Sequence, residues 1–222
     1  ITRLVVPDRV NRGTGVTLEC EYDLSSQTLY SIKWYRDDRE FFGFIPSQTP
    51  HKQVHQLPGI QIDMSLSTGP AVHLNEVDLD SGGQYKCEVI SESPHYHTAD
   101  RSADMLVVEI PEEKPTIEGT QHQYHIGDRA NLVCISAKSK PPAELIWYIN
   151  DKEAPENYLE RLPSIDHDDG LTQTHLGLRF TVTRTQFKHG EMTLRCSARI
   201  SSLYYKTQQH SVDGELTYHV PV

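Results

Sequence analysis

The stretch Gly83-Gln84-Tyr85-Lys86-Cys87-Glu88-Val89 decides the fold. A tyrosine two residues before a cysteine, in a run that alternates polar with apolar residues, is typical of strand F of an immunoglobulin sandwich. In that strand the cysteine bridges to strand B of the other sheet, and a tryptophan packs against the bridge. The stretch therefore predicts a cysteine and a tryptophan upstream.

Both residues are present upstream at fitting distances. Cys20 precedes Cys87 by 67 residues, and Trp34 follows Cys20 by 14. The run Val16–Cys20 alternates apolar with polar residues, which is the pattern of a half-buried strand. The long stretch between Trp34 and the next strand, which carries Val72, Leu74 and Val77, leaves room for three more strands, so we expect a V-type domain. Ser81 stands where the common pattern has an aspartate, so the usual arginine–aspartate bridge lacks its carboxylate.

The second half of the chain repeats the pattern. Trp147 follows Cys134 by 13 residues, and Cys196 follows Cys134 by 62. Leu194 occupies the corner-tyrosine position, so that hydrogen bond is not expected here. The polar, proline-flanked stretch 111–115 between the halves suits a linker. We predict an all-β chain of two tandem immunoglobulin sandwiches, residues 1–112 (V-type) and 113–222.

The four cysteines allow three pairings, and their spacing favours one. Cys20–Cys87 and Cys134–Cys196 each lie within one predicted domain. Two long-range disulfides indicate an oxidising compartment, so we expect an extracellular protein, secreted or displayed at the cell surface. No run approaches the roughly 18 apolar residues of a membrane helix. We therefore expect membrane attachment only through an anchor outside this chain.

The charge of the chain argues against several classes of partner. The formal net charge is −10, and most of the acidic excess lies in residues 1–112. Nucleic acids and anionic membrane surfaces require clustered positive charge, which the chain lacks. There is no G-x-S-x-G run, Gly-rich phosphate loop or H-E-x-x-H motif, so we predict neither an enzyme nor a small-molecule substrate nor a cofactor. The acidic turn 166–170 does not have the spacing of a calcium loop, and no metal is predicted.

One run is more specific than the cysteine and tryptophan frame. Residues 29–42, with Lys33-Trp34-Tyr35-Arg36-Asp37 at the centre, resemble strands C and C′ of the Beaten path family of insect neuronal proteins. The runs 83–89 and 141–150 fit the same family, so the resemblance covers about residues 15–200. Gly43 departs from it, since a larger and often basic residue is expected there. The resemblance implies a neuronal recognition protein whose first domain binds immunoglobulin receptors of the Sidestep family.

Strand parity predicts which side chains would form such a binding face. If Trp34 points into the core, its neighbours in sequence point outward, and the same reasoning applies to strand F around Cys87. Strands C and F are neighbours in one sheet, so their outward residues form one surface. The predicted surface contains Lys33, Tyr35, Gln84, Lys86 and Glu88. The alternative is that these residues form an ordinary solvated sheet face.

The position of the phenylalanines depends on the turn between strands C and C′. A two-residue turn places Phe42 and Phe44 on the outer face beside Tyr35, and we favour this register. A three-residue turn exposes Phe41 and Ile45 instead. A third possibility is that two of the phenylalanines lie in the core and the third is covered by the following loop.

The loop between strands F and G, residues 91–101, adds further candidates. His95 and Tyr96 lie at its centre, and a polar recognition loop that uses Tyr96 is the favoured interpretation. His95 and His97 could share a metal ion, but no third ligand lies at a fitting spacing. The alternative is a plain solvated loop.

These observations predict a cell-recognition module that acts in axon guidance or synaptic partner recognition. We expect the C, C′, F and G strands of the first domain to bind a Sidestep-type ectodomain, and the second domain to act as a spacer. The alternative is a homophilic, nectin-like adhesion protein that self-associates through the same face, which carries both Lys33 and Glu88. An immune-type receptor that binds through its loops is a further alternative.

Overall fold

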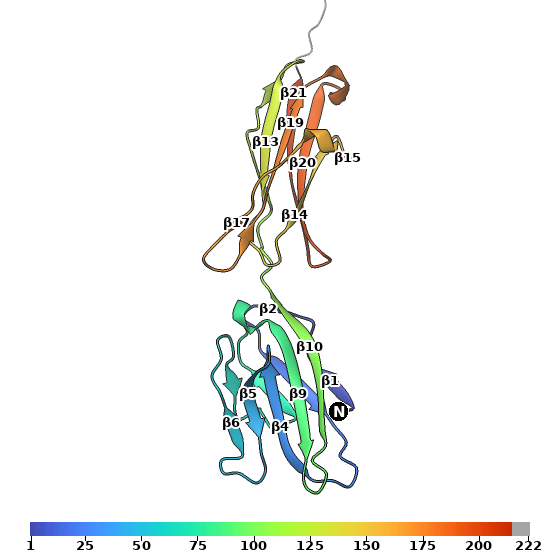
Figure 1. Cartoon of the computed structure of the whole chain (residues 1–222). Coiled ribbons are helices and arrows are strands. Elements are labelled where there is room, and N and C mark those ends of the chain that lie inside the picture. The colour runs from blue at the N-terminus through green and yellow to red at the C-terminus, as the bar shows by residue number, and fades with distance from the viewer. Residues whose placement is uncertain (215–222) are drawn as a thin grey trace, which may run out of the picture. The chain divides into compact units, whose positions relative to one another are not determined.

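The structure is a computed structural model that describes residues 1–214 of the 222. Its described residues form two all-β units, each with two packed sheets (Figure 1). The contacts divide the chain between Val108 and Glu109 rather than after Glu112. Glu109 groups with the second unit because its backbone exchanges two hydrogen bonds with Lys140, of 2.9 and 3.0 Å. The last residues of the second predicted domain, 215–222, lie outside the described part.

The first unit has a four-stranded and a six-stranded sheet. The four-stranded sheet runs in the order β1 (Arg3–Val5), β3 (Val16–Glu21), β8 (Ala71–Leu74), β7 (Ile62–Asp63). The six-stranded sheet runs in the order β2 (Arg9–Asn11), β10 (Thr98–Val108), β9 (Gly83–Ser91), β4 (Leu29–Arg36), β5 (Arg39–Phe44), β6 (Lys52–Val54). A 3₁₀ turn, η1 (Leu79–Ser81), precedes β9. The strands β5 and β6 extend the second sheet as C′ and C″ do in a V-type immunoglobulin domain, so the predicted type is confirmed.

The core of the first unit forms where the two sheets face each other. The predicted disulfide Cys20–Cys87 is present and joins β3 of one sheet to β9 of the other. Trp34 on β4 is fully buried beside it, and its indole Nε1 donates a 2.8 Å hydrogen bond to the carbonyl of Gly69. Burial alternates along β3, because successive side chains of a strand point to opposite faces.

The corner before strand F is closed as the sequence predicts. The hydroxyl of Tyr85 is fully buried and donates a 2.5 Å hydrogen bond to the carbonyl of Ser81. Ser81 does not leave the underside of the sandwich open, although it replaces the usual aspartate. Its Oγ donates to the carbonyl of Gly59 at 2.6 Å, and Arg36 donates to the carbonyls of Pro58 and Asp80. Backbone carbonyls thus take the place of the carboxylate.

The expected register of Phe42 and Phe44 on the outer face is wrong. A β-bulge interrupts the pairing of β4 with β5, where Trp34 pairs with Phe42 but Tyr35 pairs with Glu40. The extra residue, Phe41, puts two successive side chains into the core, and both Phe41 and Phe42 are fully buried. Phe44 pairs with the inward residue Ile32 and is half-buried at the edge of the core.

The second unit repeats the sandwich with shorter edges. One sheet runs β11 (Thr116–Glu118), β13 (Arg129–Ile135), β19 (His175–Thr181), β16 (Leu159–Arg161). The other runs β12 (Gln123–Tyr124), β21 (Tyr204–Gly214), β20 (Glu191–Ile200), β14 (Glu144–Ile149), β15 (Lys152–Glu153). The remaining elements are a hairpin of β17 (Ile165–Asp166) with β18 (Thr172–Gln173) and the 3₁₀ turns η2 (Glu156–Tyr158) and η3 (Arg184–Gln186). The predicted disulfide Cys134–Cys196 joins β13 to β20.

The second unit closes its corner without a tyrosine. Leu194 is fully buried at that position, as the sequence indicates. Asn150, at the turn after β14, does the bonding instead. Its side-chain Nδ2 donates to the carbonyl of Gln186, and its Oδ1 accepts a 2.9 Å hydrogen bond from the backbone N–H of Thr193. One amide side chain therefore satisfies backbone groups on two neighbouring segments.

Candidate protein-binding surface

The outer face of the six-stranded sheet brings together five of the predicted site residues. Tyr35 on β4 lies directly opposite Lys86 on β9, and Lys33 lies opposite Glu88. Gln84 follows on the same face of β9, opposite Asp104 of β10. Directly opposed residues of neighbouring strands share one face, so these side chains form a continuous surface. We call it the CFG face; it covers β10, β9, β4 and β5, which lie side by side in Figure 1.

Tyr35 lies at the centre of the CFG face and is held by its neighbours. Its hydroxyl donates a 3.1 Å hydrogen bond to Glu88 Oε1. The ammonium group of Lys86 lies 4.9 Å from the centre of the Tyr35 ring, a cation–π distance. Burial, together with the hydrogen bond to Glu88, raises the pKa of the Tyr35 hydroxyl well above its usual range. The ring is therefore fixed and half-exposed, and its hydroxyl is protonated.

The two lysines of the CFG face are both engaged by carboxylates of the first domain. Lys86 Nζ lies 2.6 Å from Asp38 Oδ1, and this contact raises the pKa of the Lys86 ammonium. Lys33 Nζ lies 3.4 Å from Glu40 Oε2. Glu40 also approaches His55, whose Nε2 lies 3.9 Å from Oε1. The lysines and their partners thus form a network across the strands.

The phenylalanines expected beside Tyr35 are absent from this surface. Glu40 stands opposite Tyr35, and Gly43 stands opposite Lys33. A Cβ atom at Gly43 would lie 3.1 Å from Glu40 Oε1 and 3.8 Å from Lys33 Cγ. Gly43 is buried, so a larger residue there would displace the Glu40 carboxylate.

The loop between β9 and β10 is shorter than residues 91–101, because β10 already begins at Thr98. Tyr96 is exposed, and its ring meets that of Tyr30 edge-to-face at 5.9 Å between centroids. The His95 and His97 rings lie 5.8 Å apart. No cluster of three metal-ligating side chains occurs among residues 1–214. The loop thus contributes one ring of an aromatic pair, that of Tyr96. The other ring, that of Tyr30, comes from the start of β4.

Several residues of this surface were not predicted from the sequence. Asp100 lies opposite Glu88 and Asp104 lies opposite Gln84, so both belong to the CFG face. Their signal was available, since the buried residues Met105 and Val107 alternate with Asp104 on the same strand. Asp38 and Tyr30 carried no comparable signal, because their contacts depend on turn and loop geometry.

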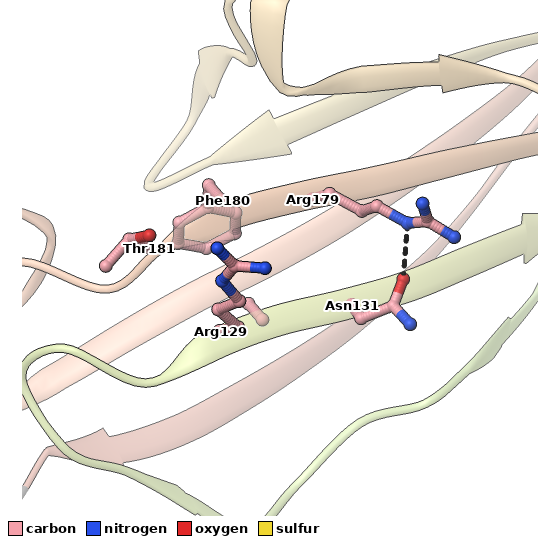
Figure 2. A pocket seen from close by; sticks show the side chains of 6 residues that line it. Arg129, Asn131, Arg179, Phe180 and Thr181 are labelled. Carbon is pink, nitrogen blue, oxygen red and sulfur yellow. Dashed lines mark hydrogen bonds between the residues drawn. The ribbon is translucent and has the colours of Figure 1, made fainter.

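A groove on the second unit provides no catalytic constellation. It lies over β13 and β19 and is lined by Arg129, Ala130, Asn131, Arg179, Phe180 and Thr181 (Figure 2). Arg179 Nε donates a 2.9 Å hydrogen bond to Asn131 Oδ1 and lies 2.8 Å from Glu160 Oε2. Its charge is already balanced, and the lining has neither a carboxylate nor a histidine to act as a base.

Comparisons with known proteins agree with this architecture. Residues 109–204 match the family model of the CD80-like C2-set immunoglobulin domain. The crystal structure of Rst D1-D2 superposes with a TM-score of 0.61 at 18% identity and covers 96% of this chain and 99% of that one. The chain is a tandem immunoglobulin-domain protein. Murine CEACAM1b shares the fold as well, with a TM-score of 0.60, 14% identity and coverage of 94% and 96%.

The sequence relatives of this tandem immunoglobulin-domain protein are cell adhesion molecules. It is 25% identical to "Cell adhesion molecule 2" of Xenopus tropicalis over 87% of this chain and 41% of the relative. It is 34% identical to "Cell adhesion molecule 4" of Xenopus laevis over 37% of this chain and 20% of the relative. It is 22% identical to mouse "Cell adhesion molecule DSCAML1" over 89% of this chain and 8% of the relative. The chain therefore spans less than half the length of these relatives.

All three of these relatives are named as cell adhesion molecules. The comparisons contain nothing specific to the Beaten path family. In residues 1–214, no helix is both long enough and apolar enough to cross a membrane.

Proposed function

We propose that this chain is an extracellular neuronal recognition module that binds an immunoglobulin domain of a partner through the CFG face. The observation that carries the proposal is the arrangement around Tyr35. A half-buried aromatic ring is clamped by Glu88 and Lys86 at the centre of a polar sheet face. Fixed aromatic residues that are surrounded by charged groups are typical of interface hot spots, because little side-chain entropy is lost on binding.

The proposed partner is an ectodomain of the Sidestep type. The support for this choice is the resemblance of residues 29–42 to the Beaten path family. The role would be axon guidance or synaptic partner recognition at the cell surface. The adhesion-molecule relatives are consistent with a protein partner rather than a substrate. The second domain acts as a spacer in this proposal.

A homophilic adhesion protein is the second candidate. The names of the relatives favour it, because several are cell adhesion molecules. The CFG face also carries both signs of charge, which an isologous contact between two copies requires. This candidate uses the same face as the first, so binding assays that include the chain itself separate the two.

An avidity-enhanced binding screen tests the proposal. The full chain is displayed as a multimer and applied to a panel of Sidestep-type ectodomains and to itself. A Tyr35→Ala, Lys86→Glu double variant is compared with the parent chain. The matched control is Tyr205→Ala, Lys206→Glu, which changes the same residue types at exposed positions of the second domain.

The proposal expects one ectodomain to bind, with binding lost in the first double variant and kept in the control. Self-binding alone, lost in the same variant, would establish the homophilic candidate. A panel on which the chain binds neither an ectodomain nor itself would contradict both candidates. Circular dichroism of each variant separates loss of contact from loss of fold.

A further inference from the structure

Carboxylates outnumber ammonium groups on the CFG face and around its rim. Pairing across the strands places Glu88, Asp100 and Asp104 on β9 and β10, and Glu40 on β5. Asp38, at the turn between β4 and β5, reaches Lys86 from the rim. Lys33 and Lys86 are the two lysines that share this surface. The face therefore carries an excess of negative charge, concentrated toward β10.

Each lysine of the six-stranded sheet already contacts an oxygen atom of the first domain. Lys86 is bound by Asp38 and Lys33 by Glu40. Lys52, on the edge strand β6, donates a 2.9 Å hydrogen bond to the carbonyl of Met64. Arg39 pairs with the inward residue Arg36, so it lies toward the other side of the sheet. Except for Arg9, which is exposed on β2 opposite the outward residue Leu106, the cations near the face are thus engaged or directed elsewhere.

The carboxylates near β10 form no such close contact, although Asp100 is near enough to Lys86 to help raise the pKa of its ammonium group. Asp100 and Asp104 are exposed and form no ion pair within residues 1–214. Asp100 lies directly opposite Glu88, and like charges in that position destabilise a sheet. A local conflict of this kind, on an exposed surface, is expected where function requires the charges.

We propose that the CFG face binds a basic surface of a different protein, with arginine or lysine side chains placed against Glu88, Asp100 and Asp104. This inference rests on the proposed function and specifies the chemistry of its partner. A second copy of the chain is a poor occupant, because its own face has the same excess of carboxylates and both of its lysines already contact carboxylates. The inference therefore favours the heterophilic candidate over the homophilic one.

The aromatic pair at the end of the face strengthens the case for arginine. Tyr96 and Tyr30 lie near the start of β10, the strand that carries Asp100. A guanidinium group binds a carboxylate through two parallel hydrogen bonds and also stacks on aromatic rings, whereas an ammonium group acts as a point charge. Exposed carboxylates beside exposed tyrosines thus suit an arginine-bearing partner.

The experiment measures binding kinetics with the ectodomain that binds the full chain in the screen above. Asp100→Asn, Asp104→Asn removes two negative charges from the CFG face with little change in shape. Glu19→Gln, Glu76→Gln removes two negative charges elsewhere on the same domain and serves as the matched control. Both chains and the parent are measured at low and at high salt, and the parent alone is analysed by sedimentation over a concentration series.

The inference expects the first variant to bind roughly three- to tenfold more slowly at low salt, since opposite charges steer association. The difference should shrink at high salt, because the Debye length falls from about 10 Å at 0.1 M to about 3 Å at 1 M. The control should match the parent, and the parent should sediment as a monomer.

The outcomes separate this inference from the proposed function. Binding that is lost with Tyr35→Ala but unchanged by Asp100→Asn, Asp104→Asn and by salt would leave the proposed function standing and overturn the inference. Binding that is unaffected by either change would place the contact outside the CFG face and overturn both. Self-association of the parent that is lost with Tyr35→Ala would also overturn the inference.

Discussion

At the scale of single residues, Tyr35 combines the properties on which the proposed function depends. Its ring lies beneath the ammonium group of Lys86, and its hydroxyl is bound by Glu88. These two neighbours have opposite charges, so they fix the ring without leaving a large net charge beside it. A partner that covers Tyr35 gains apolar contact and displaces few of the existing bonds.

The titration of Tyr35 tests this arrangement. Burial and the carboxylate of Glu88 raise the pKa of its hydroxyl, so it should remain protonated well above pH 10. Because the raised value belongs to the folded state, the associated stability is present below about pH 10 and is lost as the pH rises toward the folded-state pKa. Glu88→Gln should lower the pKa of Tyr35. Ring-carbon NMR shifts over a pH series measure it, with Glu76→Gln as the control; an equal pKa in all three chains would contradict the arrangement.

Single residues were also the most predictable level of this protein. The two cysteine pairs, Trp34 and Tyr85 occupy positions that every sandwich of this type fills for the same physical reasons. The bonds of Ser81 and Arg36 to backbone carbonyls were not predictable. The sequence showed that a carboxylate was missing, but a backbone acceptor leaves no trace in the residue pattern.

At the scale of elements, the bulge in β5 explains why the expected surface differs from the observed one. Parity predicts the faces of a strand only while the pairing stays regular, and one extra residue reverses it. The run Phe41-Phe42-Gly43-Phe44 gave no local sign of the extra residue. Parity therefore worked on β9 and from Ile32 onward on β4, where the cysteine and tryptophan anchor it. It failed on β5 and at the start of β4, where Ser31 and Ile32 are both buried.

Two truncations test the burial of this strand. Phe42→Ala should destabilise the first domain by about 3–5 kcal/mol, the usual cost for a buried phenylalanine. Phe44→Ala should cost less, because Phe44 is only half-buried. Urea denaturation, monitored through hydrogen exchange of first-domain amides, measures the loss of stability in both variants. Equal costs, or a larger cost for Phe44→Ala, would contradict the observed register.

Gly43 provides a test of the shape of the CFG face. Its backbone does not require glycine, and the nearest atom to an added Cβ is the flexible end of Glu40 at 3.1 Å. Gly43→Arg should therefore leave the melting temperature within a few degrees but displace the Glu40 carboxylate beside Lys33 and add a bulky side chain to the face, lowering partner binding roughly tenfold or more. Gln53→Arg, directly opposite Gly43 on β6, adds the same charge without displacing Glu40. Equal effects of the two variants would show that charge, not shape, determines the loss.

At the scale of the whole molecule, each domain has its own core and its own disulfide. The first core is built around Trp34 and the second around Trp147, and no residue of one cluster belongs to the other. The overall plan of two sandwiches was predictable because the cysteine and tryptophan spacing occurs twice. The charge distribution was predictable only as a total, since the pairing of each lysine depends on the turns.

The proposed division of labour predicts that residues 1–108 suffice for binding. This fragment contains the complete first core, the Cys20–Cys87 disulfide and every residue of the CFG face. It should fold when produced under oxidising conditions and bind the partner within about threefold of the full chain, since no contact is removed. Surface plasmon resonance compares the two. A loss of more than tenfold in a folded fragment would assign part of the binding site to the second domain.

The pairing of β2 with β10 has a mechanical consequence. The two strands run parallel, with Arg9 beside Leu106 and Asn11 beside Val108. Tension applied to the ends of the domain draws β2 and β10 in opposite directions along their own axes, so the hydrogen bonds between them are loaded together in shear rather than peeled one at a time. The second domain repeats the device, with β12 parallel to β21. Each domain therefore resists pulling at the parallel pair that its second strand forms with its last described strand.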